Sequence, residues 1–568
     1  MSSSRSPRVL LRHLANLLAP GLVFLPSYAA FVQFQGYPLW RPEVLVTAGL
    51  LLLAGLPFGL LLSLRPRTFG AAAVALLLFA WITQISAEGI VDLLALWDGF
   101  SQSLVAWAGL YGGLAISFLV ALLIAVIPFA ALSWLRPNLG IVLATVFSVT
   151  LVSTLLLPAE PLPLGETYRR DAGPAKDLPP VIHLVFDEQI GVEGLPADIA
   201  GSEDLRDELR RFYEDFGFTL FGRAYSEYAR TNHSMIALLN GFDSLDGKFP
   251  EGPDAFWRSF WDNRWFKVLA QRGYLIHAYH MNGWDYCGGE AGHAARCVTY
   301  TTGSITNIEG ADLTVEAKTK VIFASYLHSL VPYRAFRLLA GPDDRPPWVL
   351  PERPFLYAPD SLGVLERMLA DIRAAPRGTA YFAHLMIPHV THMLDQDCKV
   401  RADPLTWTSY GDLDIPTGVL NSPASREARY IGYFAQVRCL HSALRRFLEG
   451  LKEIGVFEDA TILVHGDHGS RIARIAPLTT TPRPLSDEDL ADMYSVLFAV
   501  RSPSLAPGYR PDLVSLQALF RETFLGGPPR DRPPEVYLDY PATIDTSLTK
   551  PPFPRRPMSD LRRAPNSP

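Results

Sequence analysis

Residues 460–471 have the sequence ATILVHGDHGSR, which gives the first indication of the fold. The apolar run 461–464 predicts a buried strand, and Asp467 and His468 follow shortly after it. A rigid strand end that presents a carboxylate and an imidazole beside glycines, which let the backbone turn tightly, suits a metal ion. Carboxylate with imidazole favours Zn, Mn or a similar divalent cation. Asp-His-Gly also occurs in surface turns, so the remaining ligands have to come from elsewhere in the chain.

Composition divides the chain of 568 residues into unequal parts. The net charge of −6 is mild and gives no indication of a nucleic-acid partner. Nearly all long apolar runs precede residue 158. We therefore expect a transmembrane domain at 1–157, a Pro-rich and charged linker at 158–180, a catalytic domain at 181–525, and a largely irregular Pro/Arg-rich tail at 526–568.

The N-terminal part predicts several membrane-spanning helices. Uncharged runs long enough to cross a bilayer lie at 14–34, 44–64, 69–87 and 139–157, and the uncharged stretch 99–135 provides one or two more. Six basic residues set the orientation. Arg5, Arg8 and Arg12 precede the first run, Arg65 and Arg67 follow the run 44–64, and Arg136 follows the stretch 99–135. The positive-inside rule then predicts an all-α bundle of about five helices, a cytoplasmic N-terminus and an exported C-terminal part. Six spans, the alternative, would place that part inside.

The four cysteines all lie in the C-terminal part. An even count there is typical of disulfides in an oxidising compartment. We expect Cys287 to pair with Cys297 and Cys398 with Cys439. Four unpaired buried thiols are the alternative, and the lack of a CxxC motif argues against a cysteine zinc site.

The C-terminal part predicts alternating strands and helices. The run 181–186, VIHLVF, is typical of a strand buried on both faces, and it ends at Asp187-Glu188. Another predicted strand, 381–385, leads to His389. This alternation predicts an α/β domain with a central, largely parallel sheet. Because active sites in such sheets gather at the carboxyl ends of the strands, we expect these residues to meet the Asp-His pair of the opening stretch.

Four patterns, in this order, resemble the sulfatase-like branch of the alkaline phosphatase superfamily. VIHLVFDE at 181–188 is similar to its first strand, which ends in acidic metal ligands, and ELRRFYEDFGFTLFGRAYSEYART at 208–231 resembles its helix, strand and nucleophile loop. FAHLMIPHV at 382–390 resembles the segment that brings in a histidine, and GVFEDATILVHGDHGSR at 455–471 the last metal-ligand strand. The resemblance covers about 178–503 and implies the fold of that family.

The resemblance places the nucleophile at Thr231. This residue stands where formylglycine sulfatases have a cysteine, and Gly241 stands at the glycine that closes their motif. His233 and Met235 replace the proline and arginine of that motif, which argues against ordinary sulfatase chemistry. In having a threonine at this position, the chain resembles the phosphoethanolamine transferases, lipoteichoic acid synthases and nucleotide phosphodiesterases of the superfamily, which use threonine as the nucleophile. The first two classes also place about five spans before an exported catalytic domain.

The resemblance also implies a metal site. We expect Asp187, Glu188 or both to hold a divalent ion together with Asp467 and His468, with Thr231 Oγ as a further ligand. Zn or Mn is the expected ion, and Mg and Ca are alternatives. A bound ion would activate the threonine hydroxyl, which is a poor nucleophile at neutral pH.

Three further residues are expected around the reacting group. His389 is expected to bind the phosphoryl group or to protonate the leaving oxygen, because imidazole titrates near working pH. His384 and Arg471 are candidates for binding the substrate, with purely structural roles as the alternative.

These observations favour a membrane-anchored, metal-dependent transferase. It would move a phospho-linked head group from a phospholipid donor to an envelope glycan or lipid acceptor through a phospho-threonine. We expect a multi-pass protein of the cytoplasmic (inner) membrane, with its catalytic domain on the periplasmic or extracellular side. The first alternative is an extracytoplasmic hydrolase of sulfuric or phosphoric esters. The second is an inactive relative with a binding or assembly role, and the intact threonine and Asp-His pair argue against it.

Overall fold

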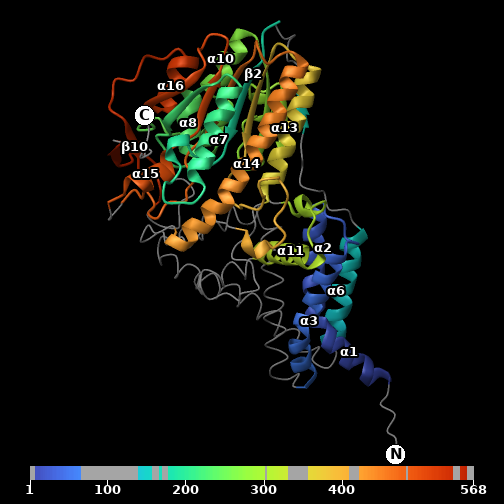
Figure 1. Ribbon diagram of the computed structural model, residues 1–568. Coiled ribbons are helices and arrows are strands. Elements are labelled where there is room, and N and C mark those ends of the chain that lie inside the picture. The colour runs from blue at the N-terminus through green and yellow to red at the C-terminus, as the bar shows by residue number, and fades with distance from the viewer. Residues whose placement is uncertain are drawn as a thin grey trace, which may run out of the picture. The chain divides into compact units, whose positions relative to one another are not determined.

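The computed structural model describes residues 7–64, 139–156, 166–168, 177–300, 304–330, 356–407, 421–480, 484–541 and 550–558 (Figure 1). The chain forms two compact units, which are described separately. The first comprises Met1–Leu162 and Ile308–Pro354, and the second comprises Pro163–Asn307 and Phe355–Pro568.

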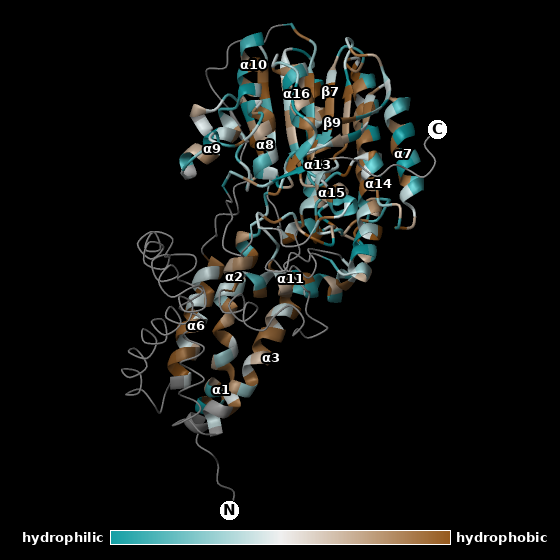
Figure 2. Cartoon of the chain, turned by 90° about the vertical axis from the view of Figure 1, so that its left-hand side faces the viewer, coloured by the Kyte–Doolittle hydropathy of each residue, from teal (hydrophilic) through white to brown (hydrophobic). Residues whose placement is uncertain are grey.

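The first unit contains apolar helices. They are α1 (Pro7–Leu22), α2 (Phe24–Phe34), α3 (Pro42–Leu64) and α6 (Leu139–Leu156), and in Figure 2 the ribbon of these helices is brown along much of its length, the colour of hydrophobic residues. Within the described residues, Leu10–Phe34 and Pro42–Leu60 are long and apolar enough to cross a membrane, and Gly140–Leu156 is a shorter apolar helix. The expected spans at 69–87 and within 99–135 lie outside the described residues. The count of five therefore stays a prediction.

Helices α1 and α3 approach each other closely at glycines. A Cβ added to Gly55 would lie 2.2 Å from the backbone nitrogen of Gly21, and one added to Gly59 would lie 2.1 Å from the carbonyl oxygen of Leu17. Small residues let helix backbones come together in this way, which is typical of helix pairs in membranes.

A helix from far along the chain belongs to this first unit. Helix α11 (Val315–Ser329) packs against α3, and the Tyr326 hydroxyl lies 2.7 Å from Ser27 Oγ. Arg41 Nε donates to Glu309 Oε1 at 3.2 Å just before that helix. The sequence assigned the whole stretch 181–525 to the catalytic domain, whereas the contacts group Ile308–Pro354 with the N-terminal helices.

The described residues of the second unit contain a nine-stranded sheet in the order β1-β5-β4-β6-β2-β7-β8-β3-β9. Five neighbouring pairs are parallel, and the three antiparallel pairs all involve β1 or β8. The predicted, largely parallel sheet is thus confirmed. The strands are β1 (Glu166–Tyr168), β2 (Val181–Phe186), β3 (Thr219–Tyr225), β4 (Leu275–Met281), β5 (Arg296–Tyr300), β6 (Thr379–Leu385), β7 (Thr461–Gly466), β8 (Phe498–Arg501) and β9 (Gly508–Ser515).

Helices cover both faces of this sheet (Figures 1 and 2). One layer contains α7 (Ser202–Asp215), α13 (Tyr357–Ala374) and α14 (Pro423–Ile454), and the other contains α8 (Thr231–Asn240), α10 (Arg264–Arg272) and α16 (Leu516–Phe524). Further helices are α9 (Pro253–Trp261) and α15 (Asp487–Tyr494). Because the central strands β2 and β6 are buried on both faces, their sequences are mostly apolar and do not alternate with polar residues.

The three central strands end at the same level. Phe186, the last residue of β2, pairs with Leu385 at the end of β6 and with Gly466 at the end of β7. The residues that follow these strands are therefore brought to one edge of the sheet, where ligand sites of parallel sheets form.

Both predicted disulfides are present. Cys287 pairs with Cys297 at a Cα–Cα distance of 6.1 Å, and Cys398 pairs with Cys439 at 4.9 Å. The second bridge ties the loop after His389 to helix α14.

Two segments that we expected to be irregular contain strands. Strand β1 lies within the predicted linker and pairs with β5. In the predicted tail, β10 (Glu535–Tyr537) pairs with β11 (Arg555–Pro557). All three are three-residue strands, which are too short to leave a periodic pattern in the sequence.

Candidate active site

A cluster of fully buried polar side chains lies at the carboxyl ends of β2 and β7. Asp187 and Glu188 follow β2, and Asp467 and His468 follow β7. The backbone N–H of Glu188 donates to Asp467 Oδ1 at 3.1 Å, so the two strand ends are joined directly. A Cβ at Gly466 would lie 2.2 Å from the carbonyl oxygen of Gln189. Only glycine fits at this point of the strand.

The donor atoms of this cluster suit a divalent cation. One ligand atom each from Asp187, Asp467 and His468 lie within 4.8 Å of one another, and so do ligand atoms of Asp187, Glu188 and His389. Asp187 Oδ1, Glu188 Oε1 and Asp467 Oδ2 are buried and accept no hydrogen bond from the residues that the structure describes. Buried carboxylate oxygens of this kind are costly unless a cation or a donor balances them. The side chains present therefore fit a metal ion.

The tautomer of His468 agrees with a ligand role. Its Nδ1 lies 2.9 Å from the carbonyl oxygen of Gly469 and must carry the proton to donate there. Nε2 then holds the lone pair and is directed at the carboxylates, 3.2 Å from Asp467 Oδ2. A carbonyl that fixes the far ring nitrogen is a common arrangement for histidines that bind metals.

Thr231 is the first residue of α8, and its side chain points into the same cluster. Its Oγ lies 3.1 Å from His468 Nε2 and donates to Asp187 Oδ2 at 3.5 Å. Because Thr231 opens a helix, the positive end of the helix dipole faces whatever binds at this hydroxyl. Ser234, one turn further on, donates to the carbonyl oxygen of Asp467 at 2.6 Å and ties α8 to β7.

The carboxyls of the cluster have divergent pKa values. Burial, together with the charge of Asp187, raises the pKa of Asp467 to about 7. Burial also raises the pKa of Glu188, although the Arg471 guanidinium acts against it. For Asp187 burial is outweighed by His389 and His384, so its pKa lies below the usual range. Three carboxyls this close cannot all ionise without added positive charge, which a divalent cation would provide.

Burial favours the neutral form of two imidazoles of the cluster. Burial lowers the pKa of His468, and the Arg471 charge lowers it further. Burial likewise lowers the pKa of His389, against the charge of Asp187. Neutral imidazoles are the form that binds metal ions or accepts a proton.

The other expected residues surround the cluster at different depths. His389 Nε2 lies 3.5 Å from Glu188 Oε1, at the edge of the cluster. Arg471 lies within reach of Glu188, at 3.6 Å, contacts His468, and remains partly exposed. His384 lies behind Asp187, with Nε2 at 3.2 Å from its Oδ2 and Nδ1 at 3.1 Å from the Tyr286 hydroxyl. Its full burial favours holding the Asp187 carboxylate over the substrate-binding role that the sequence suggested.

Sequence reasoning missed Asp539. It lies in the predicted tail, is fully buried, and contacts the loop and helix on both sides of Thr231. A signal was present, since residues 535–540 read EVYLDY, a short run of β-forming residues between Pro-rich stretches.

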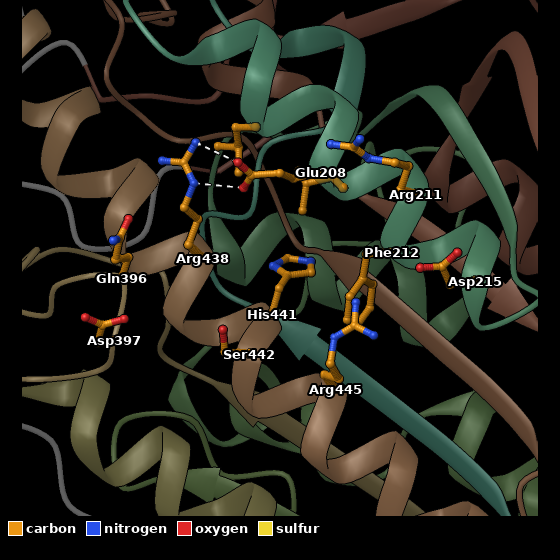
Figure 3. A pocket seen from close by; sticks show the side chains of 12 residues that line it. Glu208, Arg211, Phe212, Asp215, Gln396, Asp397, Arg438, His441, Ser442 and Arg445 are labelled. Carbon is orange, nitrogen blue, oxygen red and sulfur yellow. Dashed lines mark hydrogen bonds and ion pairs between the residues drawn. The ribbon is translucent and has the colours of Figure 1, made fainter.

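A pocket of about 460 Å³ lies elsewhere in the second unit, between α7 and α14. Figure 3 shows Arg438 paired with Glu208 across it, His441 between the two helices, and Arg445 beside Phe212. None of its lining residues belongs to the cluster at the strand ends. It is separate from the candidate active site.

A third group of side chains with metal-binding chemistry contains His280, Cys287 and Cys297. Both of its sulfurs belong to a disulfide, which links the loop after β4 to β5.

No protein-family model and no curated protein matches the chain. Solved structures similar to it include a protein from Bacteroides fragilis described as a sulfatase, with 13% identity over 66% of this chain and 83% of that one and a TM-score of 0.38. The lipoteichoic acid synthase LtaP from Listeria monocytogenes has 12% identity over 63% and 74%, with a TM-score of 0.32. The phosphonate monoester hydrolase SpPMH from Silicibacter pomeroyi has 15% identity over 63% and 79%, with a TM-score of 0.36.

The chain's own features agree with the resemblance found in its sequence: a largely parallel sheet, acidic ends on β2 and β7, and a threonine that opens α8 beside them. The fold and its strand-end cluster are those expected of the sulfatase-like branch of the alkaline phosphatase superfamily.

Proposed function

We propose that the chain is a metal-dependent phospho-group transferase that acts through a phospho-threonine at Thr231. One observation carries this proposal: the Thr231 hydroxyl lies 3.1 Å from His468 Nε2, beside buried carboxylate oxygens that accept no hydrogen bond within the described part of the chain. A nucleophile placed against a cation site is the arrangement that phosphoryl transfer requires, because the reaction depends on positioning and on charge stabilisation.

Asp187, Asp467 and His468 would hold the cation, and Glu188 and His389 offer further ligand atoms close to Asp187. When bound, a divalent cation supplies positive charge that lowers the pKa of a nearby hydroxyl and offsets charge on the non-bridging phosphoryl oxygens. The Glu188 amide, through its bond to Asp467, fixes the carboxylate for that purpose.

The reaction proceeds in two in-line steps. In the first, the bond between Thr231 Oγ and phosphorus forms, the bond between phosphorus and the diacylglycerol oxygen breaks, and the proton of the Thr231 hydroxyl passes by way of His389 to that leaving oxygen. In the second, an acceptor hydroxyl attacks the phospho-threonine and Thr231 is regenerated. We assign His389 to the second step as proton acceptor, because its lowered pKa keeps the imidazole neutral. Arg471, partly exposed at the rim, is suited to binding a phosphoryl oxygen.

The apolar helices support a lipid donor. Two described helices have the length and composition of membrane spans, and a soluble substrate would not require an anchor in the bilayer. We infer a multi-pass protein of the cytoplasmic membrane whose catalytic unit lies on the periplasmic or extracellular side. Two disulfides in that unit support an oxidising compartment. The acceptor would be a glycan or lipid of the envelope.

A hydrolase of phosphoric esters is the second candidate, since it would share the first step and send the intermediate to water. Sulfuric esters are less favoured, because threonine replaces the cysteine that sulfatases convert to formylglycine, and Met235 replaces an arginine of their motif.

The test uses the full chain in detergent with vesicles of phosphatidylethanolamine or phosphatidylglycerol labelled in the head group. Mass spectrometry of the Thr231 peptide under turnover should show a phospho-linked head-group adduct. Thr231→Ala should lack it, and Thr406→Ala, which removes an exposed hydroxyl, should retain it. Equal adducts in wild type and Thr231→Ala would refute the nucleophile assignment.

Water labelled with ¹⁸O separates the two candidates. A hydrolase incorporates the label into the released phosphoric ester, whereas a transferase passes the group to an added hydroxyl acceptor without it. For the topology, a C-terminal reporter that is active only in the cytoplasm should stay silent. A signal from it would overturn the exported placement of the catalytic unit.

A further inference from the structure

A single buried carboxylate touches the chain on both sides of Thr231. Asp539 Oδ1 accepts the backbone N–H of Ala229 at 3.2 Å, two residues before the threonine. Asp539 Oδ2 lies 2.8 Å from Nδ1 of His233, two residues after it. Asp539 and His233 are both fully buried.

This contact lies where the helix lacks a cap of its own. Arg230, the N-cap residue of α8, has an extended backbone and makes no side-chain cap hydrogen bond. Helices usually begin with a side chain that satisfies the first backbone amides and fixes the direction of the entering chain. Here Asp539 fixes the entering chain at Ala229 and the first turn at His233.

The segment that carries Asp539 is itself firmly held. The backbone N–H of Tyr537 donates to the carbonyl oxygen of Glu227 at 2.9 Å, and the Tyr537 ring stacks on Tyr228 at 4.7 Å with an angle of 5°. The Tyr494 hydroxyl donates to the carbonyl oxygen of Tyr537 at 2.6 Å. These contacts fix the backbone two residues before Asp539.

The other side of the segment is held as well. Tyr540 accepts the backbone N–H of Thr479 at 2.9 Å and donates its own to the carbonyl oxygen of Pro477 at 3.2 Å. The carboxylate of Asp539 is therefore presented from a backbone fixed at both ends, which is the requirement for holding another group in place.

We propose that Asp539 is a positioning residue for the nucleophile, and that it holds the junction between Ala229 and His233 so that Thr231 Oγ points at His468 and Asp187. This inference rests on the proposed function, since it assumes that Thr231 reacts. Asp539 acts through its contacts with the backbone of Ala229 and the side chain of His233. A displacement of about 1 Å in a reacting group costs on the order of 10²-fold in rate.

The main test compares three variants on bis-p-nitrophenyl phosphate, a phosphodiester probe. Asp539→Asn keeps the shape of the side chain but replaces the carboxylate beside His233 with a neutral amide. Asp539→Ala removes the contacts with both Ala229 and His233. Asp531→Asn, an exposed aspartate in the same tail, is the matched control. We expect kcat to fall roughly 10-fold for Asp539→Asn and about 100-fold for Asp539→Ala, with KM within about threefold of wild type, metal content unchanged and the control unaffected.

A purely structural role would give a different pattern. The variants would then lose thermal stability or folded protein, while kcat per metal-loaded molecule stayed at the wild-type value. That result would overturn the inference, and a rise in KM alone would do so too.

Hydrogen exchange provides a readout that needs no substrate. The peptide that contains Ala229 should exchange faster in Asp539→Ala than in wild type, whereas peptides of α14 should not change. Unchanged exchange at Ala229 would count against the inference even if activity fell. If Thr231→Ala retains full activity, the proposed function fails; if Thr231→Ala is inactive while both Asp539 variants match wild type, only the positioning role fails.

Discussion

The Asp467 carboxylate accepts a hydrogen bond from the backbone amide of Glu188 at 3.1 Å. The two residues are far apart in sequence but follow neighbouring strands that end in register, at Phe186 and Gly466. Glu188 has a φ of 65°, a left-handed conformation that is uncommon for a residue with a side chain. Such local strain is found where a site holds the backbone in place, and here it occurs at the residue whose amide donates to Asp467.

Gly466→Ala should disturb this arrangement. The added methyl group would lie 2.2 Å from the carbonyl oxygen of Gln189, so either β7 or the turn after β2 has to move. We expect a loss of about 1–3 kcal/mol in the free energy of unfolding and a larger proportional loss of activity. Gly363→Ala, inside α13 with nothing within 4 Å, is the control and should be neutral or stabilising by up to about 1 kcal/mol. Equal stability and activity in the two variants would contradict the close approach.

The carboxylate cluster predicts that the order of stability of wild type and Asp467→Asn depends on whether a metal ion is present. Asp467→Asn keeps an oxygen that can accept from Glu188 but loses the charge that a cation requires. With excess Zn²⁺ or Mn²⁺ the wild type should unfold at a higher temperature than Asp467→Asn, because a ligand that binds the folded state stabilises it by about 2.7 kcal/mol at 100 times its Kd. In chelator the order should disappear or reverse, since the variant relieves repulsion with Asp187. Differential scanning calorimetry in both buffers checks this, and a gap that chelator leaves unchanged would contradict a metal role.

The Cys398–Cys439 disulfide should contribute more to stability than Cys287–Cys297. The two bridges close loops with sequence separations of 41 and 10 residues, and the loss of chain entropy in the unfolded state grows with loop length. We expect roughly 4 kcal/mol for the first and about 3 kcal/mol for the second. Denaturant unfolding of the two double serine variants, with non-reducing peptide mapping of the wild type, measures this order. The reverse order would show that native-state contacts of the shorter loop dominate.

The centre of the second unit could be predicted from sequence because its signals are local. The strands β2 and β7 are rich in apolar and β-branched residues, and each is followed directly by an acidic side chain of the site, Asp187 or Asp467. A parallel sheet then brings these ends together without any knowledge of the connections between them. Thr231 was identified differently, from the resemblance of its loop to the nucleophile loop of the sulfatase-like family, and the structure places it at the start of α8.

The parts that sequence reasoning missed depend on contacts between distant segments. Helix α11 has no apolar stripe that would reveal its partner, and its assignment to the first unit rests on contacts such as that of Tyr326 with Ser27. Asp539 follows a three-residue strand in a Pro-rich stretch, so neither periodicity nor spacing marked it. His384 was identified as a candidate, but only the structure puts it behind Asp187.

Stability should fall in acid through His441, a histidine outside the active site. Its Nδ1 lies 2.9 Å from the carbonyl oxygen of Val437 and must donate there, and its Nε2 accepts from the Tyr213 hydroxyl at 3.1 Å. Burial lowers the pKa of His441 to about 4. Between that value and the ordinary pKa of about 6.5, the unfolded chain binds a proton that the folded chain does not.

The sign follows from this difference in protonation. The stabilising contribution of neutral His441 is present in full above about pH 6.5 and is lost as the pH falls toward 4, by about 3 kcal/mol in total. Other buried histidines and the cluster carboxyls also titrate, so the measurement has to compare wild type with His441→Gln, whose amide can make both hydrogen bonds without charging. Denaturant unfolding of both proteins from pH 7.5 to 4 should show the advantage of wild type shrinking by about that amount. Parallel stability curves over this range would mean that His441 is protonated in the folded protein, and that the space between α7 and α14 is open enough to water to solvate the charge.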